Sequence, residues 1–131
     1  MACEVGDWAP QKAPVPDLEH MARLASDFAA NQNDDINHWL PPVEIERGRA
    51  MMKLPADAWQ PAEGLPTEAL IHLVRFFTLA EMQLAGWEGG KTSPVIPLVR
   101  ILKARDSFTA DLRRWIKANT DNRYLPYGSA L

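Results

Sequence analysis

Residues 67–85 are the segment that most restricts the fold of this chain. Placed on an α-helix at about 100° per residue, its apolar side chains cover most of the circumference. The polar residues that share a narrow stripe are Glu68, His72, Arg75 and Gln83. A helix that is apolar on so many sides has to be surrounded by other helices. The sequence therefore predicts an all-α bundle of four to five helices around residues 67–85, with Gly86 ending the central helix.

Prolines divide the rest of the chain into candidate helices. Apolar side chains recur at helical spacing in residues 17–30, and good helix formers fill residues 43–54. Gly48 weakens the second of these helices by about 1 kcal/mol relative to alanine. Ser93 is expected to cap a helix that begins with Pro94, and the last helix is predicted from near Thr109 to Asn119.

The segments between these helices are expected to be irregular. Residues 36–40 are predicted to form a turn or a short helix, and residues 55–66, with three prolines, a loop that Trp59 anchors to the core. Residues 1–15 are expected to be an irregular proline-rich arm and residues 120–131 an extended tail. A length of 131 residues favours one domain over the whole of 1–131.

Composition excludes several classes of protein. The net charge of −3 argues against a globally basic nucleic-acid coat protein, and the single cysteine, Cys3, cannot form an internal disulfide. The N-terminal residues contain no apolar run typical of a signal peptide. Charged side chains interrupt the longest apolar stretch, so no membrane span is predicted. We therefore expect a soluble cytoplasmic protein.

The motifs that suggest enzymatic chemistry are incomplete. The sequence Gly-Gly-Lys-Thr at 89–92 lacks the earlier glycine of a phosphate-binding loop, since Ala85 occupies that position. The histidines lack the spacing of helical metal sites, so no metal or cofactor is expected. Glu81 projects on the apolar side of its helix, where burial would require a partner or raise its pKa. The preferred interpretation is that Glu81 reaches solvent from the last turn; an enzyme or metal site around Glu81 and His72 is the third functional hypothesis.

Positive charge is concentrated near the C-terminus. Residues 1–66 carry a net charge of −6, and residues 67–131 carry +3. The last two predicted helices have the spacing of a helix-turn-helix, and the residues that could then contact phosphates are Arg113, Arg114 and Lys117. A nucleic-acid-binding regulator is therefore the alternative function. A solvated basic face explains the same residues without nucleic acid.

Aromatic residues give the leading hypothesis. The chain has five tryptophans, and four of them lie outside the clearest predicted helices. Tryptophan and tyrosine are enriched at protein interfaces. The candidate partner-binding residues are Trp8, Trp87, Tyr124, Leu125 and Tyr127. The sequence therefore favours a small non-enzymatic interaction or accessory protein that binds itself, as a homodimer, or another protein. The competing interpretation is that these side chains fix loops to the protein's own core.

Overall fold

The computed structural model describes residues 16–31, 35–122 and 124–125, and these residues form only helices, turns and irregular segments. Their elements are α2 (Leu18–Asn31), α3 (Ile36–Trp39), α4 (Pro42–Met51), η2 (Ala56–Gly64, a 3₁₀ helix), α5 (Thr67–Gln83), η3 (Gly90–Thr92, also 3₁₀), α6 (Val95–Ala104) and α7 (Ala110–Asn119). The predicted all-α bundle is confirmed. No helix in the described part of the chain is long and apolar enough to cross a membrane.

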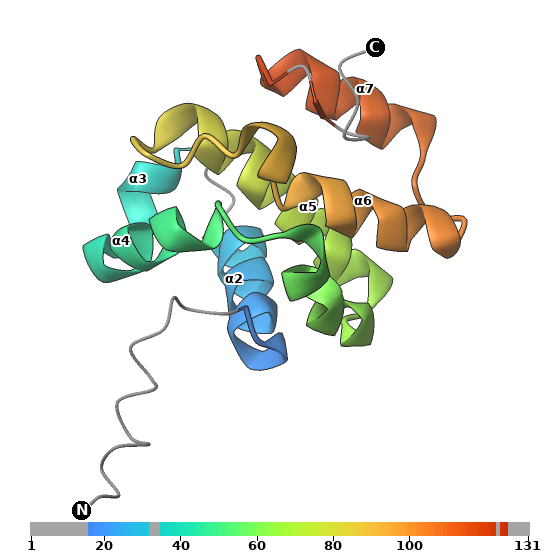
Figure 1. The fold of residues 1–131 in the computed structure, drawn as a ribbon, viewed down its shortest axis with the longest axis horizontal. Helices are drawn as coiled ribbons and strands as arrows, with labels where there is room; N and C mark the ends of the chain where they lie inside the picture. Colours follow the sequence, from blue (N-terminus) through green and yellow to red (C-terminus); the bar gives the residue numbers. More distant parts are fainter. Residues whose placement is uncertain (1–15, 32–34, 123, 126–131) are drawn as a thin grey trace, which may run out of the picture.

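Helix α5 is the centre of the bundle, as its apolar pattern predicts. It packs against α2, α3, α6 and α7, and Figure 1 shows α6 running beside it. Phe76 and Phe77 are almost completely buried, with ring centroids 5.1 Å apart in an edge-to-face arrangement. One cluster of buried apolar residues extends from Met21 in α2 to Leu125. The core is therefore assembled around the two phenylalanines of α5.

The predicted helix ends agree with the observed ones to within two or three residues. Gly86 follows α5 with a φ of +84°, a conformation that favours glycine. Thr109 caps α7, because its hydroxyl accepts a hydrogen bond from the Leu112 amide at 3.1 Å. Ser93 acts similarly at the start of α6, where its hydroxyl accepts from the Val95 amide at 3.2 Å.

The segment predicted as a loop between α4 and α5 contains the 3₁₀ helix η2, with Pro61 inside it. The loop prediction was wrong because two of the three prolines, Pro55 and Pro66, lie outside η2 and leave room for a helix between them. The expected anchor is confirmed: Trp59 is fully buried, and its ring meets Phe77 edge-to-face at 5.4 Å. This contact fixes η2 against the centre of the bundle.

Trp87 lies in a slot that α4 leaves open for it. Its indole N–H donates to the Ile45 carbonyl at 2.9 Å, and its ring packs beside Phe76 and Phe77. The six-membered part of the indole faces Gly48, where a Cβ atom would overlap it. Glycine at position 48 thus has a packing role that outweighs its low helix propensity.

The chain after α7 returns to the bundle. The Leu125 amide donates to the Asn122 carbonyl at 3.1 Å, and the Leu125 side chain is 1% exposed. This described part of the predicted extended tail is a turn, because burial of Leu125 in the core bends the chain back. Residues 126–131 and the 1–15 arm lie outside the described residues.

Candidate functional site

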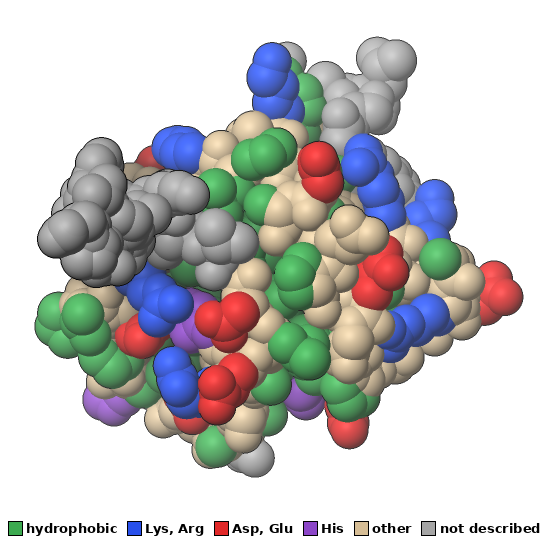
Figure 2. Space-filling model, turned by 60° about the horizontal axis from the view of Figure 1, so that its bottom comes forward, with side chains coloured by type: hydrophobic (Ala, Val, Ile, Leu, Met, Phe, Trp, Pro, Cys, Tyr) green, Lys and Arg blue, Asp and Glu red, His purple; other side chains and the backbone are tan. Residues whose placement is uncertain are grey.

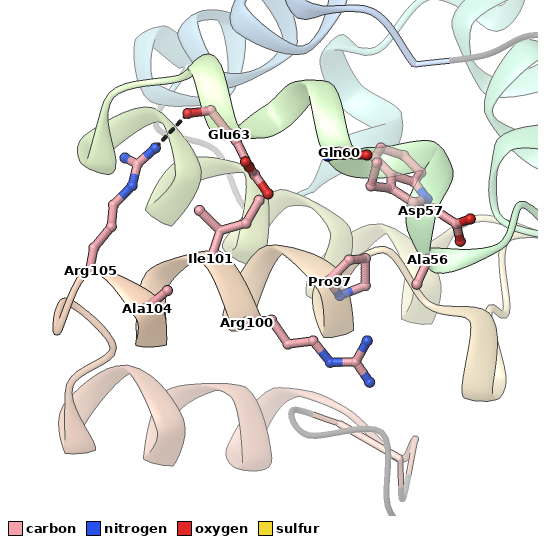
Figure 3. Close-up of a pocket in the computed structure, with 10 residues that line it drawn as sticks. Ala56, Asp57, Gln60, Glu63, Pro97, Arg100, Ile101, Ala104 and Arg105 are labelled. Carbon is pink, nitrogen blue, oxygen red and sulfur yellow. Dashed lines mark hydrogen bonds between the residues drawn. The ribbon is translucent and has the colours of Figure 1, made fainter.

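A groove of about 610 Å³ lies between η2 and α6. Figure 3 shows η2 along one side and α6 along the other. We call it the η2–α6 groove, and the residues that line it are Ala56, Asp57, Trp59, Gln60, Glu63, Pro97, Arg100, Ile101, Ala104 and Arg105. Its volume is within the range of about 300–1,000 Å³ that is typical of ligand sites.

The α6 wall is one face of a helix. The lining positions 97, 100, 101, 104 and 105 follow the three- and four-residue spacing of an α-helix, so they point the same way over two turns. The opposite face of α6 is buried in the core through residues that include Val95, Leu98 and Leu102. Burial of that apolar face therefore fixes which side chains the helix presents to the groove.

The η2 wall carries a polar row. A 3₁₀ helix has three residues per turn, so Asp57, Gln60 and Glu63 lie above one another on the same side. All three side chains are exposed and line the groove. Figure 3 shows the Glu63 carboxylate pointing toward Ile101 on α6. The groove thus has an acidic edge on η2 and, at Arg100, a basic residue on α6.

Trp59 carries a buried hydrogen-bond donor. The residue lines the groove, and its buried indole nitrogen Nε1 has no hydrogen-bond partner among the described residues. A buried donor left unpaired costs about 1–3 kcal/mol. His20 Nδ1 is likewise buried and unpaired, but it faces a cavity of only about 10 Å³, the size of a single water. Of the two residues, Trp59 is the one that lines the larger space.

Arg105 closes one end of the groove and joins its walls. Its guanidinium donates to the carbonyls of Glu63 at 2.8 Å and Leu65 at 2.9 Å, and to the hydroxyl of Thr67 at 3.2 Å. Figure 3 shows the first of these bonds. By contrast, the exposed Arg100 side chain has no hydrogen bond or ion pair with any described residue. Arg105 therefore holds the groove together, and Arg100 can contact a ligand.

Glu81 is buried, contrary to the expectation that it reaches solvent, because the 86–93 connection and the C-terminal segment cover this turn of α5. The side chain is 5% exposed; its carboxylate accepts from the Gly89 amide at 3.1 Å and the Asn122 side chain at 3.4 Å, and it bonds to the Ser93 hydroxyl. Burial raises the pKa of Glu81, the hydrogen bonds lower it in part, and the nearby Glu88 charge raises it further. The carboxylate thus connects three segments of the chain.

This burial predicts a pH-dependent stability. A raised pKa means that the folded state binds the Glu81 proton more tightly than the unfolded state does. The resulting stabilisation is fully present below the unfolded pKa of about 4.3 and is lost as pH rises through the folded pKa. Glu81→Gln keeps an oxygen for Gly89 and an amide for Ser93, but it does not titrate. We expect the free energy of unfolding of wild type to fall relative to that of Glu81→Gln as pH rises from about 4 to 8, in chemical denaturation.

The control is Glu63→Gln, which changes an exposed carboxylate in η2, away from Glu81. Its stability difference from wild type should change less over the same pH range than that of Glu81→Gln. A constant difference for Glu81→Gln would show that burial of this carboxylate does not control the pH dependence.

The predicted partner-binding residues differ in how deeply they are buried. Trp87 and Leu125 are 2% and 1% exposed, so both side chains belong to the core and neither is presented to a partner. Tyr124 is partly buried at a second hollow, of about 650 Å³, that also includes Glu81. Trp8 and Tyr127 lie outside the described residues. The burial of Trp87 and Leu125 fits the competing interpretation, in which these side chains fix loops to the protein's own core.

The predicted basic residues are on the surface of α7. Arg113, Arg114 and Lys117 are exposed, and Arg114 forms an ion pair with Asp111 one turn earlier. Helix α7 packs mainly on α5. On the face in Figure 2, acidic and basic side chains are interspersed. Nucleic-acid binding by α7 stays a prediction.

Glu81 and His72, the residues of the hypothetical enzyme or metal site, have different neighbours in the structure. The His72 ring contacts Phe28, with centroids 6.4 Å apart, whereas Glu81 bonds to Gly89, Ser93 and Asn122. Across residues 16–31, 35–122 and 124–125, no group of three or more His, Cys, Asp or Glu side chains is placed to hold a metal ion.

The residues that line the η2–α6 groove were not predicted from the sequence. The three-residue spacing of Asp57, Gln60 and Glu63 is visible in the sequence, but it indicates a polar face only once a 3₁₀ helix is known. In the sequence, Arg100 is only one of the basic residues of the positively charged segment 67–131.

Comparison of the chain with protein-family models, with curated proteins and with solved structures gave no match.

Proposed function

We propose that this protein is a non-enzymatic interaction protein that binds a segment of another protein in the η2–α6 groove. The observation that carries the proposal is the groove itself, about 610 Å³ in volume, with exposed acids on η2 and, on α6, Arg100, which has no hydrogen bond or ion pair with any described residue. The proposal keeps the interaction function that the aromatic composition favours, but moves the binding surface from Trp87 and Leu125 to the groove.

The shape of the groove favours an elongated occupant. Its α6 wall extends from Pro97 to Ala104, roughly 10 Å at 1.5 Å per residue. An extended peptide advances about 3.3 Å per residue, so three to four residues cover this wall. The charged side chains lie at the exposed edges of the groove, where they can contact a partner without losing their hydration completely. We place this function in the cytoplasm, as the sequence predicts.

The test is a comparison of two variants that differ only in where a long side chain is added. Ala104 is exposed and lines the groove, so Ala104→Arg fills part of it; Ala118→Arg adds the same side chain to the exposed surface of α7. We expect wild type and Ala118→Arg to capture similar amounts of partner protein from cell lysate. Ala104→Arg should capture at least about tenfold less, which corresponds to a loss of about 1.4 kcal/mol in binding free energy. Quantitative mass spectrometry of the captured proteins measures this ratio.

Equal capture by the two variants would contradict the proposal. Sedimentation of both variants adds a second criterion. If the groove bound a second copy of this chain, Ala104→Arg would abolish a dimer that wild type and Ala118→Arg form, and the proposal of a different protein as partner would be wrong.

A further inference from the structure

The charged residues at the two edges of the η2–α6 groove differ in sign. On η2, Asp57 and Glu63 are exposed acids with Gln60 midway between them. On α6, Arg100 is the basic residue free to contact an occupant, since Arg105 is bonded to the backbone of η2 and the start of α5. An occupant lying along the groove therefore meets negative charge on one side and positive charge on the other.

The spacing of the η2 row matches that of an extended peptide. Asp57, Gln60 and Glu63 are separated by roughly 6 Å per step, because a 3₁₀ helix rises about 2.0 Å per residue. In an extended chain, residues i, i+2 and i+4 point to the same side at intervals of about 6.7 Å. Three alternate residues of one strand can thus face the three residues of the row in register.

The residues between them point to the opposite side, toward α6. Figure 3 shows Gln60 on the η2 side of the groove and Arg100 on the α6 side. The residue at i+1 is then placed on the Arg100 side. Trp59 also lines the groove, but it is fully buried and belongs to its floor.

We propose that the η2–α6 groove recognises an extended segment with basic residues at positions i and i+4, facing Asp57 and Glu63, and an acidic residue at i+1, facing Arg100. This inference rests on the proposed function and specifies its partner. The alternation of charge sets the register, because a shift by one residue would bring like charges together on both edges.

The probe is the peptide acetyl-Lys-Glu-Ser-Ala-Lys-amide. Its control, acetyl-Lys-Glu-Ser-Lys-Ala-amide, has the same composition but places the second lysine on the α6 side. We expect the first peptide to bind about fivefold more tightly, because exposed charge pairs contribute modestly and additively. Titration followed by NMR should move the amide signals of η2 and α6 and the indole N–H signal of Trp59, which lies beneath the groove. Trp59→Phe identifies that indole signal.

Two variants test the origin of the preference. Asp57→Asn combined with Glu63→Gln should remove the preference for the first peptide, and both positions are exposed, so the fold should be retained. Arg100→Gln should lower the affinity for the first peptide. Arg113→Gln, which changes an exposed arginine on α7, should leave that affinity unchanged. Raising salt from about 0.05 to 0.5 M should reduce the preference in wild type.

The outcomes separate this inference from the proposed function. If both peptides move the groove signals with equal affinity, the groove binds extended segments and the charge register is wrong. If neither peptide moves them, while capture from lysate still depends on Ala104, the specificity proposed here is wrong and the function stands. If capture does not depend on Ala104, the function fails and the register fails with it.

Discussion

Replacing Phe77 with alanine should lower the free energy of unfolding by roughly 3–5 kcal/mol. The side chain is 1% exposed, and its ring contacts those of Trp59 at 5.4 Å, Phe76 at 5.1 Å and Trp87 at 6.4 Å. Truncation leaves a cavity among three large rings. These rings belong to separate elements, so they cannot all move to fill it. Denaturant unfolding of both proteins measures the difference.

Two further variants make this prediction specific. Phe77→Leu retains most of the buried volume and should cost less than Phe77→Ala. Val43→Ala removes an apolar side chain that is 71% exposed, and should change stability by less than about 0.5 kcal/mol. A melting temperature of Phe77→Ala within a degree of wild type would mean that the buried face of α5 has been assigned incorrectly.

Gly48→Ala should also destabilise the protein, although alanine is the better helix former. Helix propensity alone predicts a gain of about 1 kcal/mol. The added Cβ would overlap the Trp87 ring, which is held by its bond to the Ile45 carbonyl and by the rings of Phe76 and Phe77. Overpacking of this kind costs about 1–3 kcal/mol, so we expect a net loss of up to about 2 kcal/mol in thermal or denaturant unfolding.

Gly64→Ala is the matched control for this second prediction. There the new Cβ would approach only the side chain of Leu18, which is 44% exposed and free to move. We expect this variant to stay within about 0.5 kcal/mol of wild type. A gain in stability for Gly48→Ala equal to the propensity difference would show that the Trp87 slot is not tightly packed.

The central helix could be predicted because its signal is local and repeated. The apolar positions of α5 recur over seventeen residues, and Gly86 and Thr109 mark helix boundaries through their own chemistry. Trp59 as an anchor followed from its position among prolines. In each case, the physical cause of the structure is contained in a short stretch of sequence.

The groove and the Trp87 slot depend on pairs that are distant in sequence. Trp87 fits because Gly48, thirty-nine residues earlier, lacks a side chain, and Glu81 is buried because Asn122 and the 89–93 segment cover it. Arg105 bonds to Glu63 across forty-two residues. A single sequence carries no record of which distant residues meet, so an aromatic in a glycine-rich connection suggested a surface anchor when it is a core residue.

The Arg105 contact has a consequence for how this protein can change by mutation. Two of its three acceptors are main-chain carbonyls, those of Glu63 and Leu65. Every amino acid carries that carbonyl, so the bond to residue 63 does not depend on which side chain is present there. The charge at position 63 can therefore vary between descendants of this chain while the wall that carries it stays in place. The charge at this edge of the groove and the position of its η2 wall are thus determined by different atoms of the same residue, and selection can alter the first without disturbing the second.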